Sequence, residues 1–499
     1  MPHRIRGSDV RPSAFRTVLA MNILHVASEC APFVKTGGLA DVIGAVPKAL
    51  ADMGVASKVM LPLYPAVRAK VPKGETVFSE DAFFGGPARL VATQAEGLDL
   101  LLLDAPHLYD REGGIYLDGD GRDWPDNHLR FGALSRAAAQ VALDGIDGWT
   151  PDIAHAHDWQ AGLVPAYLRQ AGNDAPRSVL TIHNIAFQGL FDAGVRKALD
   201  IPDSQFTQEG MEYFGAVSFL KAGLVYADRI TTVSPTYARE LLQPEFGLGM
   251  EGVLRARQGV LSGILNGIDL DVWNPKTDPD LAATYDARSL KQKARNKTAV
   301  RERFGLDAQA DGPLFCLVSR LTGQKGIDLL LEALPGLVGR GAQLAVLGSG
   351  DRRLEGGFLG AAHHYRGRVG VVIGYDESLS HLMQGGSDAI LIPSRFEPCG
   401  LTQLYGLRYG TVPVVARTGG LADTVIDANE AALAVDCATG IQFAPVTAAA
   451  LDQAIGRACD LWRQPKVWEG MVKRGMKHPV GWETSARAYL DLYEGLAAE

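Results

Sequence analysis

Two short segments combine glycines with basic residues in a way that suits a phosphorylated ligand. Lys35 directly precedes the sequence Thr-Gly-Gly-Leu-Ala-Asp at residues 36–41, and residues 319–326 carry Arg320 and Lys325. Glycines let backbone N–H groups approach a ligand closely, and a helix that begins there adds the positive end of its dipole. If the two segments converge, they predict a site for a nucleotide diphosphate. Surface salt bridges are the alternative role for the basic residues.

The sequence Thr-Gly-Gly-Leu-Ala-Asp occurs at residues 36–41 and again at residues 418–423. Each copy follows a predicted strand by a short loop and stands where a helix should begin. Apolar residues at helical spacing follow the first copy, although Pro47 among them predicts a kink or an early end of that helix. The repeat predicts an anion site at each copy, and a tight strand-to-helix turn is the alternative for either copy alone.

A carboxylate follows an apolar predicted strand in the second half of the chain. Glu397 lies within Ser-Arg-Phe-Glu-Pro-Cys-Gly-Leu-Thr, residues 394–402. Gly400 allows the backbone to approach a ligand at the start of the next helix. This placement favours a ligand-facing role for Glu397 over that of a solvated loop glutamate.

Histidines and an aspartate stand at the ends of two other predicted strands. His155 and His157 share one face of their strand because side chains alternate along it. Asp158 and Trp159 follow in the loop, where a carboxylate and a ring can receive a sugar. His183 ends the next strand. A metal site at the histidine pair is disfavoured because no matching ligand cluster stands elsewhere in the sequence, and packing or hydrogen bonding is favoured.

The elements that must position these residues are strands that alternate with helix-length stretches. This alternation is typical of parallel sheets with crossover helices, and it predicts two doubly wound α/β domains in tandem. A region rich in Asp, Pro and Lys at residues 266–280 predicts the break between them. The predicted strands span residues 22–29, 57–61, 98–104, 153–157, 178–183 and 229–233 in the first series, and residues 313–319, 343–347, 369–375, 389–393 and 412–417 in the second.

Composition excludes several classes of protein. The chain has 499 residues with 49 Lys plus Arg against 57 Asp plus Glu, a formal charge of -8 and no basic block, so nucleic acid is an unexpected partner. No long apolar run or secretory leader is recognised, so we expect no membrane partner and a cytoplasmic location. Five widely spaced cysteines fit reduced thiols. Residues 1–20 are expected to form an unstructured extension before Met21.

Taken together, the motifs resemble the bacterial glycogen synthase family, which includes the plant starch synthases, over residues 21–499. Residues 35–41, 155–159, 319–326 and 394–402 occur in the family's order and at its approximate spacing. The resemblance implies a GT-B fold, with two Rossmann-like domains facing each other across a cleft. It implies an acceptor and catalytic domain at residues 21–265, a nucleotide-sugar domain at residues 266–478, and a C-terminal helix at residues 479–499 that crosses back to the first domain.

The same resemblance implies transfer of glucose from ADP-glucose to the non-reducing end of an α-1,4-glucan with retention of configuration. No cofactor or metal is expected. Lys35, Arg320 and Lys325 would hold the diphosphate, and His183 and Glu397 complete the expected catalytic set. Tyr375 would stack on adenine. Further substrate contacts are implied for Gly37, Gly38, Asp41, Asp158, Asn184, Asn266, Gln324, Cys399, Gly400, Leu401 and Thr402.

Three alternatives stay open from the sequence. An α-glucan phosphorylase would share the fold but carry pyridoxal phosphate, and a non-catalytic glucan-binding protein would keep the fold without turnover. No residue ties the donor to adenine rather than uracil. Tyr405 departs from the broader superfamily, where a second Glu stands eight positions after the first, so one ribose contact expected from that superfamily is missing.

Overall fold

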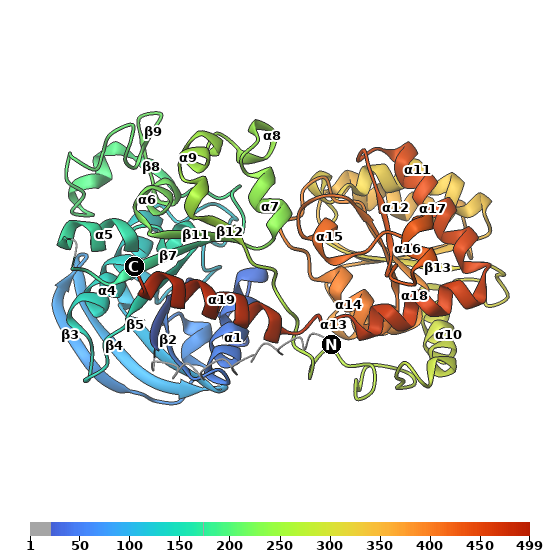
Figure 1. Ribbon diagram of the computed structural model, residues 1–499, viewed down its shortest axis with the longest axis horizontal. Helices are drawn as coiled ribbons and strands as arrows, with labels where there is room; N and C mark the ends of the chain where they lie inside the picture. Colours follow the sequence, from blue (N-terminus) through green and yellow to red (C-terminus); the bar gives the residue numbers. More distant parts are fainter. Residues whose placement is uncertain (1–20, 173) are drawn as a thin grey trace, which may run out of the picture.

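The computed structural model describes residues 21–172 and 174–499, so the extension expected at residues 1–20 lies outside the described part. Two α/β lobes follow each other along the chain, and the last helix returns from the second lobe to the first (Figure 1). Both lobes contain a sheet with parallel strands and intervening helices, which confirms the predicted fold class. Within the described residues, none of the helices combines the length and apolar character needed to cross a bilayer.

The first lobe contains a nine-stranded sheet. Its first seven strands in spatial order are parallel, and the last two join antiparallel at one edge. The spatial order is β12 (Leu261–Gly263), β11 (Arg229–Thr232), β7 (Arg177–Ile182), β6 (Ile153–His157), β1 (Met21–Val26), β2 (Val55–Pro62), β5 (Leu98–Asp104), β4 (Gly86–Ala95) and β3 (Glu75–Phe83). A separate three-stranded sheet contains β8 (Leu190–Asp192), β10 (Ala216–Ser218) and β9 (Glu212–Tyr213).

The second lobe contains a six-stranded, fully parallel sheet. Every residue of the strands at its centre is buried or half-buried, as expected when helices cover both faces. The spatial order is β15 (Val369–Ile373), β14 (Gln343–Gly348), β13 (Leu314–Val318), β16 (Ala389–Ile392), β17 (Val412–Ala416) and β18 (Ile441–Phe443).

Helices connect the strands in both lobes. Those of the first lobe are α1 (Gly38–Ala51), α2 (Pro65–Arg68), α3 (Pro106–Tyr109), α4 (Asn127–Asp144), α5 (Val164–Ala171), α6 (Phe219–Tyr226), α7 (Pro235–Glu240), α8 (Pro244–Gly247) and α9 (Glu251–Ala256). The helices C-terminal to them are α10 (Lys293–Phe304), α11 (Ile327–Gly339), α12 (Arg352–His364), α13 (Glu377–Gly386), α14 (Thr402–Tyr409), α15 (Gly419–Thr424), α16 (Glu430–Ala434), α17 (Ala448–Trp462), α18 (Pro465–Lys477) and α19 (Trp482–Ala497).

Every strand predicted from an apolar run is present, and each end lies within three residues of the predicted one. Of the two outcomes predicted at Pro47, a kink or an early end, the early end does not occur, because α1 continues to Ala51. A proline inside a helix removes one backbone hydrogen bond at a cost of about 3 kcal/mol. Burial of the apolar face that includes Val42, Val46 and Leu50 offsets that cost.

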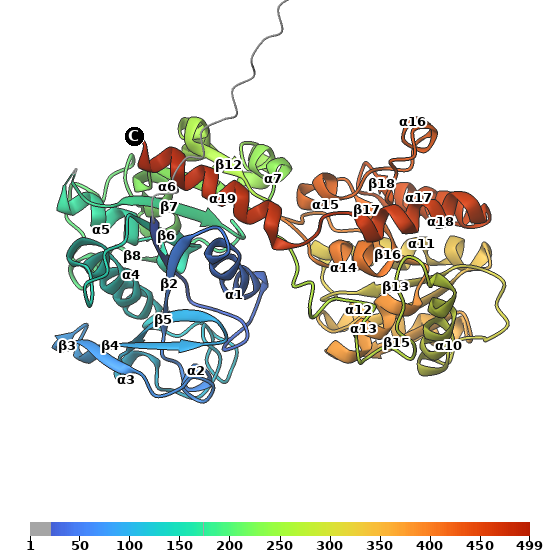
Figure 2. The same cartoon turned by 60° about the horizontal axis from the view of Figure 1, so that its bottom comes forward.

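Helix α19 crosses back onto the first lobe and packs on α1, as both views show (Figures 1 and 2). Tyr489, Leu490 and Tyr493 share one apolar cluster with residues of β1 and α1. The Ser485 hydroxyl donates to Leu265 O at 2.5 Å, where the chain leaves the first lobe. The helix therefore stabilises the first lobe while it remains covalently joined to the second.

Candidate active site

The loops that carry the motifs all follow strands at the points where the two sheets reverse their order. In the first sheet β1 lies between β6 and β2, and in the second β13 lies between β14 and β16. Open α/β sheets bind ligands beyond the carboxyl ends of strands at such a reversal. Lys35 follows β1, Asp158 follows β6, Lys325 follows β13 and Glu397 follows β16. The topology thus brings the motifs of each lobe together.

The first glycine loop presents an open face to solvent. Lys35 is exposed, and its Nζ lies 2.8 Å from Asp41 Oδ1, so its charge is held beside the start of α1. Gly37 and Gly38 are exposed, and a Cβ atom added to either would meet no other atom within 4 Å. The loop has the space and the positive charge that an anionic ligand requires.

A buried carboxylate that sequence reasoning missed shapes this loop. Glu29 accepts hydrogen bonds from Thr36 N at 2.5 Å, from the Thr36 hydroxyl at 2.6 Å and from Gly37 N at 3.1 Å. The Tyr116 hydroxyl donates to the same carboxylate at 2.6 Å. An acidic residue between β1 and the glycine loop was the available signal. Glu29 therefore fixes the shape of the loop, and it already occupies two of the backbone N–H groups that could have bound an anion, those of Thr36 and Gly37.

In the second lobe, one basic and one acidic candidate residue, Lys325 and Glu397, form an ion pair. Lys325 Nζ lies 2.5 Å from Glu397 Oε2, and the Ser394 hydroxyl donates to the same oxygen at 2.9 Å. Gly326 has φ +65°, and a Cβ atom there would lie 1.9 Å from Pro393 O. Only glycine therefore allows the two loops to pack this closely. The pair is mostly buried, and it fixes a cation and an anion beyond the carboxyl ends of the neighbouring strands β13 and β16.

The loop after β13 also carries Gln324 and Arg320, which have different surroundings. Gln324 Nε2 donates to Phe396 O at 3.3 Å, which ties its loop to that of Glu397. Arg320 is exposed, and no salt bridge reaches it from residues 21–172 or 174–499. Its guanidinium is available to a ligand.

The second glycine loop does not repeat the open arrangement of the first. Gly419 N donates to the Glu240 carboxylate at 3.0 Å, and Gly420 N donates to Glu397 O at 3.1 Å. A Cβ atom on Gly419 would lie 1.9 Å from Glu397 O. The anion site predicted at this copy is therefore wrong for a free ligand: the loop binds a carboxylate of the first lobe and supports the Glu397 segment.

Asp158 connects the ends of β6 and β7. Its Oδ1 accepts the backbone N–H groups of His183 at 2.6 Å and Asn184 at 3.4 Å. Burial raises the pKa of Asp158 to about 7, although these two backbone donors lower it. Asp158 has φ +56° and ψ −171°, a conformation that costs of order 1–3 kcal/mol in a non-glycine residue and is concentrated at functional sites.

Two further buried polar side chains lie beyond the carboxyl ends of strands of the first sheet: His183 after β7 and Asn266 after β12. Burial lowers the pKa of His183 to about 3, so its imidazole is neutral at physiological pH. Asn266 is 8% exposed, and its Oδ1 has no hydrogen-bond partner among the described residues. An unpartnered buried amide oxygen costs free energy unless a ligand donates to it. The Asn266 Oδ1 atom is therefore available to accept a hydrogen bond from a ligand.

The segment after Glu397 provides backbone more than side chains. Burial raises the pKa of the Cys399 thiol to about 12, so it is an inert thiol rather than a nucleophile. Gly400 has φ +72°, and Leu401 is the N-cap of α14, which begins at Thr402 without a side-chain cap. The free backbone N–H groups of this first turn are suitable donors to a phosphate.

Tyr375, expected to stack on the base, and Tyr405, which stands where the broader superfamily has a Glu, have different surroundings. Tyr375 is 82% exposed, and its hydroxyl donates to Glu377 at 2.9 Å, which leaves the ring face open for stacking. Tyr405 instead stacks on Trp273, with ring centroids 3.6 Å apart. Position 405 therefore belongs to a packed aromatic stack, in which a carboxylate would lose this contact.

The two lobes face each other at these residues. Burial raises the pKa of Asp41 in the first lobe, Lys35 lowers it, and the negative charge of Glu377 in the second lobe raises it again. The Ser234 hydroxyl of the first lobe donates to Pro398 O at 2.7 Å, and Thr236 N donates to Asp423 at 2.6 Å. The Lys35 loop and the Glu397 loop thus flank one interdomain site.

A parallel two-lobe fold with cations at the facing strand ends defines a glycosyltransferase of the GT-B class, and the comparisons with known proteins agree. The starch synthase catalytic domain family matches residues 22–256, and the glycosyl transferases group 1 family matches residues 300–470. The glycogen synthase of Roseobacter denitrificans is 67% identical over 95% of this chain and 99% of its own length. The chain belongs to the bacterial glycogen synthase family.

Other relatives agree. Glycogen synthase 1 of Rhizobium meliloti is 55% identical over 96% of this chain and 100% of its own length. The catalytic domain of Starch Synthase IV from Arabidopsis thaliana, solved with ADP and acarbose, has a TM-score of 0.86 and 31% identity, covering 96% of this chain and 100% of that one. Sucrose-phosphate synthase from Thermosynechococcus elongatus, at 19% identity, shares the fold alone.

Proposed function

We propose that this chain transfers glucose from ADP-glucose to the non-reducing end of an α-1,4-glucan, with retention of configuration and release of ADP. The observation that carries the proposal is the Lys325–Glu397 pair, fixed 2.5 Å apart beyond the carboxyl ends of β13 and β16, together with the exposed cations Lys35 and Arg320 on loops of the two lobes. Membership of the glycogen synthase family supports the same activity. The acceptor is glycogen or a shorter maltooligosaccharide.

The charges of the site suit the chemistry of glycosyl transfer. Positive charge develops at the anomeric carbon, and negative charge develops on the departing diphosphate. Lys35, Arg320 and Lys325 stabilise that negative charge more in the transition state than in the ground state, because it is greatest there. Glu397 accepts hydrogen bonds from glucose hydroxyls, and Tyr375 stacks on the base.

The remaining substrate contacts are part of the same proposal. Asn266 Oδ1 accepts a hydrogen bond from the sugar or the acceptor, and His183, Asp158 and Asn184 line the same pocket. Backbone N–H groups contribute from both lobes. The proposed backbone and loop contacts are Gly38, Asp41, Gln324, Cys399, Gly400, Leu401 and Thr402. Gly37 provides room for the ligand rather than a donor, because its N–H group donates to Glu29.

We propose front-face attack rather than a double displacement. The acceptor hydroxyl oxygen bonds to the anomeric carbon on the face that the diphosphate leaves, the bond from that carbon to the phosphate oxygen breaks, and the hydroxyl proton passes to the departing phosphate. A double displacement needs a free carboxylate as nucleophile. Asp158 is engaged by His183 N, and Glu397 by Lys325. Trapping of a covalent glucosyl-enzyme would contradict this mechanism.

The proposal also assigns a different substrate to each domain. Residues 21–265 bind the acceptor and residues 266–478 bind the sugar nucleotide. Residues 479–499 join the second domain back onto the first. We place the reaction in the cytoplasm, where ADP-glucose and glucan are the partners, and assign no nucleic acid or membrane partner.

The donor and the reaction are tested by measuring nucleotide release and glucan growth with ADP-glucose, with UDP-glucose and without donor. We expect ADP release in step with glucan growth. Preference for UDP-glucose would overturn the base assignment and keep the chemistry. Glycogen binding without turnover of either donor would favour the non-catalytic binding protein, and a pyridoxal absorbance band would favour a phosphorylase.

Metal removal should leave the reaction unchanged. Because Lys35, Arg320 and Lys325 supply the positive charge that a divalent cation supplies in other phosphoryl-binding sites, we expect dialysis against EDTA to change kcat by less than about twofold. Turnover before and after dialysis is the measurement. Loss of activity that Mg²⁺ or Mn²⁺ restores would contradict a cofactor-free site.

Substitution of Glu29 should weaken donor binding. Glu29→Gln replaces one acceptor oxygen with an N–H₂ group that faces the N–H groups of Thr36 and Gly37, so the loop loses its present shape. We expect KM for the sugar nucleotide to rise about tenfold, which corresponds to about 1.4 kcal/mol. Steady-state kinetics at saturating glycogen measure this.

Asp104→Asn is the matched control for Glu29→Gln. Asp104 is a similarly buried carboxylate of the same lobe, but its partners are Arg68 and Arg89, away from the glycine loop. We expect this variant to lower stability and leave KM unchanged. An equal rise in KM in both variants would show a general effect of the lobe rather than a role of Glu29 in shaping the loop.

A further inference from the structure

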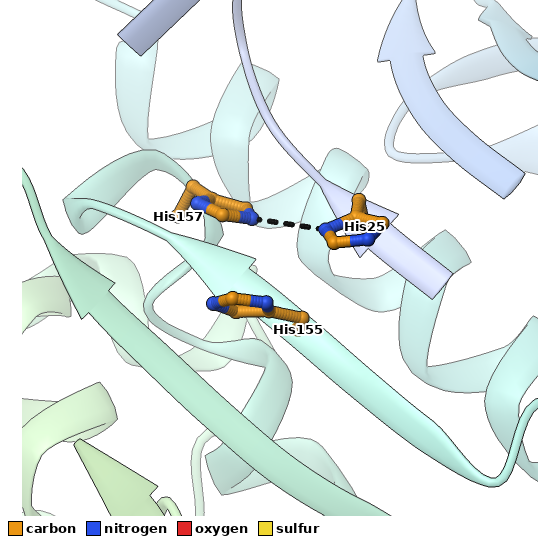
Figure 3. A group of neighbouring side chains, drawn as sticks. All are labelled: His25, His155 and His157. Atoms are coloured by element: carbon orange, nitrogen blue, oxygen red, sulfur yellow. Dashed lines mark hydrogen bonds between the residues drawn. The ribbon is translucent and has the colours of Figure 1, made fainter. Parts of the chain in front are cut away.

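Three histidines, His25 of β1 and His155 and His157 of β6, gather in the interior of the first lobe (Figure 3). Their side chains are at most 1% exposed. His25 Nδ1 lies 3.3 Å from His157 Nε2, and the His155 and His157 rings stack with centroids 4.1 Å apart. A buried cluster of this kind invites two interpretations, a metal site or a hydrogen-bonded array.

The hydrogen bonds of His155 decide against a three-histidine metal site. His155 Nδ1 lies 2.6 Å from the Tyr493 hydroxyl of α19, and its Nε2 lies 2.6 Å from the Thr181 hydroxyl. Both of its nitrogens are therefore occupied. His155 joins α19 to the sheet and takes no part in the hydrogen bonds of the other two histidines.

His25, His157 and His183 form a row of three hydrogen-bonded rings, the histidine chain, which ends at the proposed sugar pocket. His157 Nε2 faces His25 Nδ1, and His157 Nδ1 lies 3.1 Å from His183 Nε2. Burial lowers the pKa of His25 and His183 to about 3 and that of His157 well below its usual range, so all three rings are neutral at physiological pH. Each neutral ring has one N–H donor and one acceptor nitrogen.

Neutrality forces the protons to follow one direction along the chain. His157 has two nitrogen partners, so it donates to one and accepts from the other. Either every ring donates toward His183, or every ring donates toward His25. The choice determines whether Nδ1 of His183, the nitrogen that lies outside the chain, carries a proton or a lone pair.

The far end of the chain selects the direction. His25 Nε2 is buried and has no hydrogen-bond partner among the described residues. If the rings donated toward His25, this nitrogen would carry a buried N–H without an acceptor. An orphaned buried N–H is rarer than an unpaired acceptor. A bare lone pair at His25 Nε2 is therefore favoured, and the protons lie on the three Nδ1 atoms.

We infer that His25 and His157 are positioning residues that fix His183 as the Nδ1–H tautomer, so that His183 donates a hydrogen bond to a hydroxyl of the bound sugar. This role rests on the proposed function, since it requires a sugar beside His183. His157 Nδ1–H donates to His183 Nε2, which is thereby kept as an acceptor. Without that donor, His183 is free to carry its proton on Nε2 and to present only a lone pair to the sugar.

The tautomer is measured directly in the ligand-free protein. Two-bond ¹H–¹⁵N correlation spectra of ¹⁵N-histidine-labelled protein at pH 7.5 distinguish Nδ1–H from Nε2–H, and His183→Gln identifies the signal. We expect wild-type His183 to be the Nδ1–H form. Observation of Nε2–H in the wild type would overturn the inference. Because no substrate is present, this result is independent of whether ADP-glucose is the donor.

Two substitutions at His157 test whether this residue acts through its hydrogen bond to His183 or only by filling space. Asparagine places its amide N–H where Nδ1 lies, so His157→Asn keeps the donor to His183. Glutamine places its amide where Nε2 lies, so His157→Gln removes that donor. We expect the Nδ1–H form of His183 and kcat/KM within about threefold of wild type in the first variant, and loss of that form with kcat/KM at least about tenfold lower in the second.

His155→Asn is the matched control, since His155 lies on the same strand, is equally buried and stacks on His157. We expect this variant to lower the melting temperature and leave the His183 signal unchanged. An unchanged His183 signal in His157→Gln, or the same change of signal in His155→Asn, would overturn the inference. Normal tautomers in a protein that turns over neither sugar nucleotide would instead place the failure in the proposed function.

Discussion

Glu397→Ala should lower kcat about 100-fold, with the protein still folded. The carboxylate is 8% exposed, lies 2.5 Å from Lys325 and accepts from Ser394, so its position is fixed before a sugar binds. Truncation removes the proposed acceptor for glucose hydroxyls and frees Lys325 from its fixed place beside the proposed position of the leaving group. A preorganised group of this kind contributes about 2.7 kcal/mol or more to transition-state stabilisation. Steady-state kinetics with ADP-glucose and glycogen give the value.

Asp388→Ala is the matched control for Glu397→Ala. Asp388 lies 2.6 Å from Lys297 in a pair of comparable burial in the same lobe, but it precedes β16, whereas Glu397 follows it. The two carboxylates are therefore at opposite ends of one strand. We expect the control to lower the melting temperature and leave kcat within about twofold. Near-normal turnover in Glu397→Ala would contradict the assignment of this carboxylate to the site.

Lys325→Ala should also lower kcat about 100-fold, because it removes a positive charge from the developing diphosphate. Its Nζ is held by Glu397, and Gly326 lets its loop approach the backbone after β16, so little reorganisation is needed when the donor reacts. We expect the affinity for ADP to fall less than kcat, since the charge of the phosphates is greatest as the sugar leaves. Calorimetric titration of ADP and turnover measured on the same preparation test this split.

Lys297→Ala is the corresponding control, with the same residue type in a pair at the opposite strand end. Removing either lysine leaves a partly buried carboxylate unpaired, so both variants should be less stable than wild type. Only Lys325→Ala should lose turnover. Equal loss in both variants would show that the effect comes from the stability of the lobe.

Most of the parallel strands could be predicted because strands buried on both faces are continuous apolar runs, as in β13 and β16. The edge hairpin of β3 and β4 could not, because β3 is largely exposed and its residues from Glu75 to Phe83 mix charged and apolar types without a clear period. The course of α1 through Pro47 was also missed. Local propensity disfavours the proline, and only packing on α19 shows why the helix continues.

The site could be predicted as a set of motifs but not as a network of contacts. Loops that follow neighbouring strands must converge, so the pairing of Lys325 with Glu397 was accessible in outline. The carboxylates that hold the two glycine loops, Glu29 and Glu240, depend on loop conformation and domain packing. The chain from His25 to His183 depends on strand register, which sets His25 beside His155 and was not available from the sequence.

Glucosyl transfer to a glucan is tested most directly by the structure of the product made from a maltooligosaccharide and ADP-glucose labelled with ¹³C at the anomeric carbon. Anomeric ¹³C and ¹H spectra report the linkage, and ADP is quantified in the same sample. We predict new α-1,4 linkages at chain ends, with one ADP released for each glucosyl residue added. A β linkage, or ADP release without growth of the glucan, would contradict the proposed reaction.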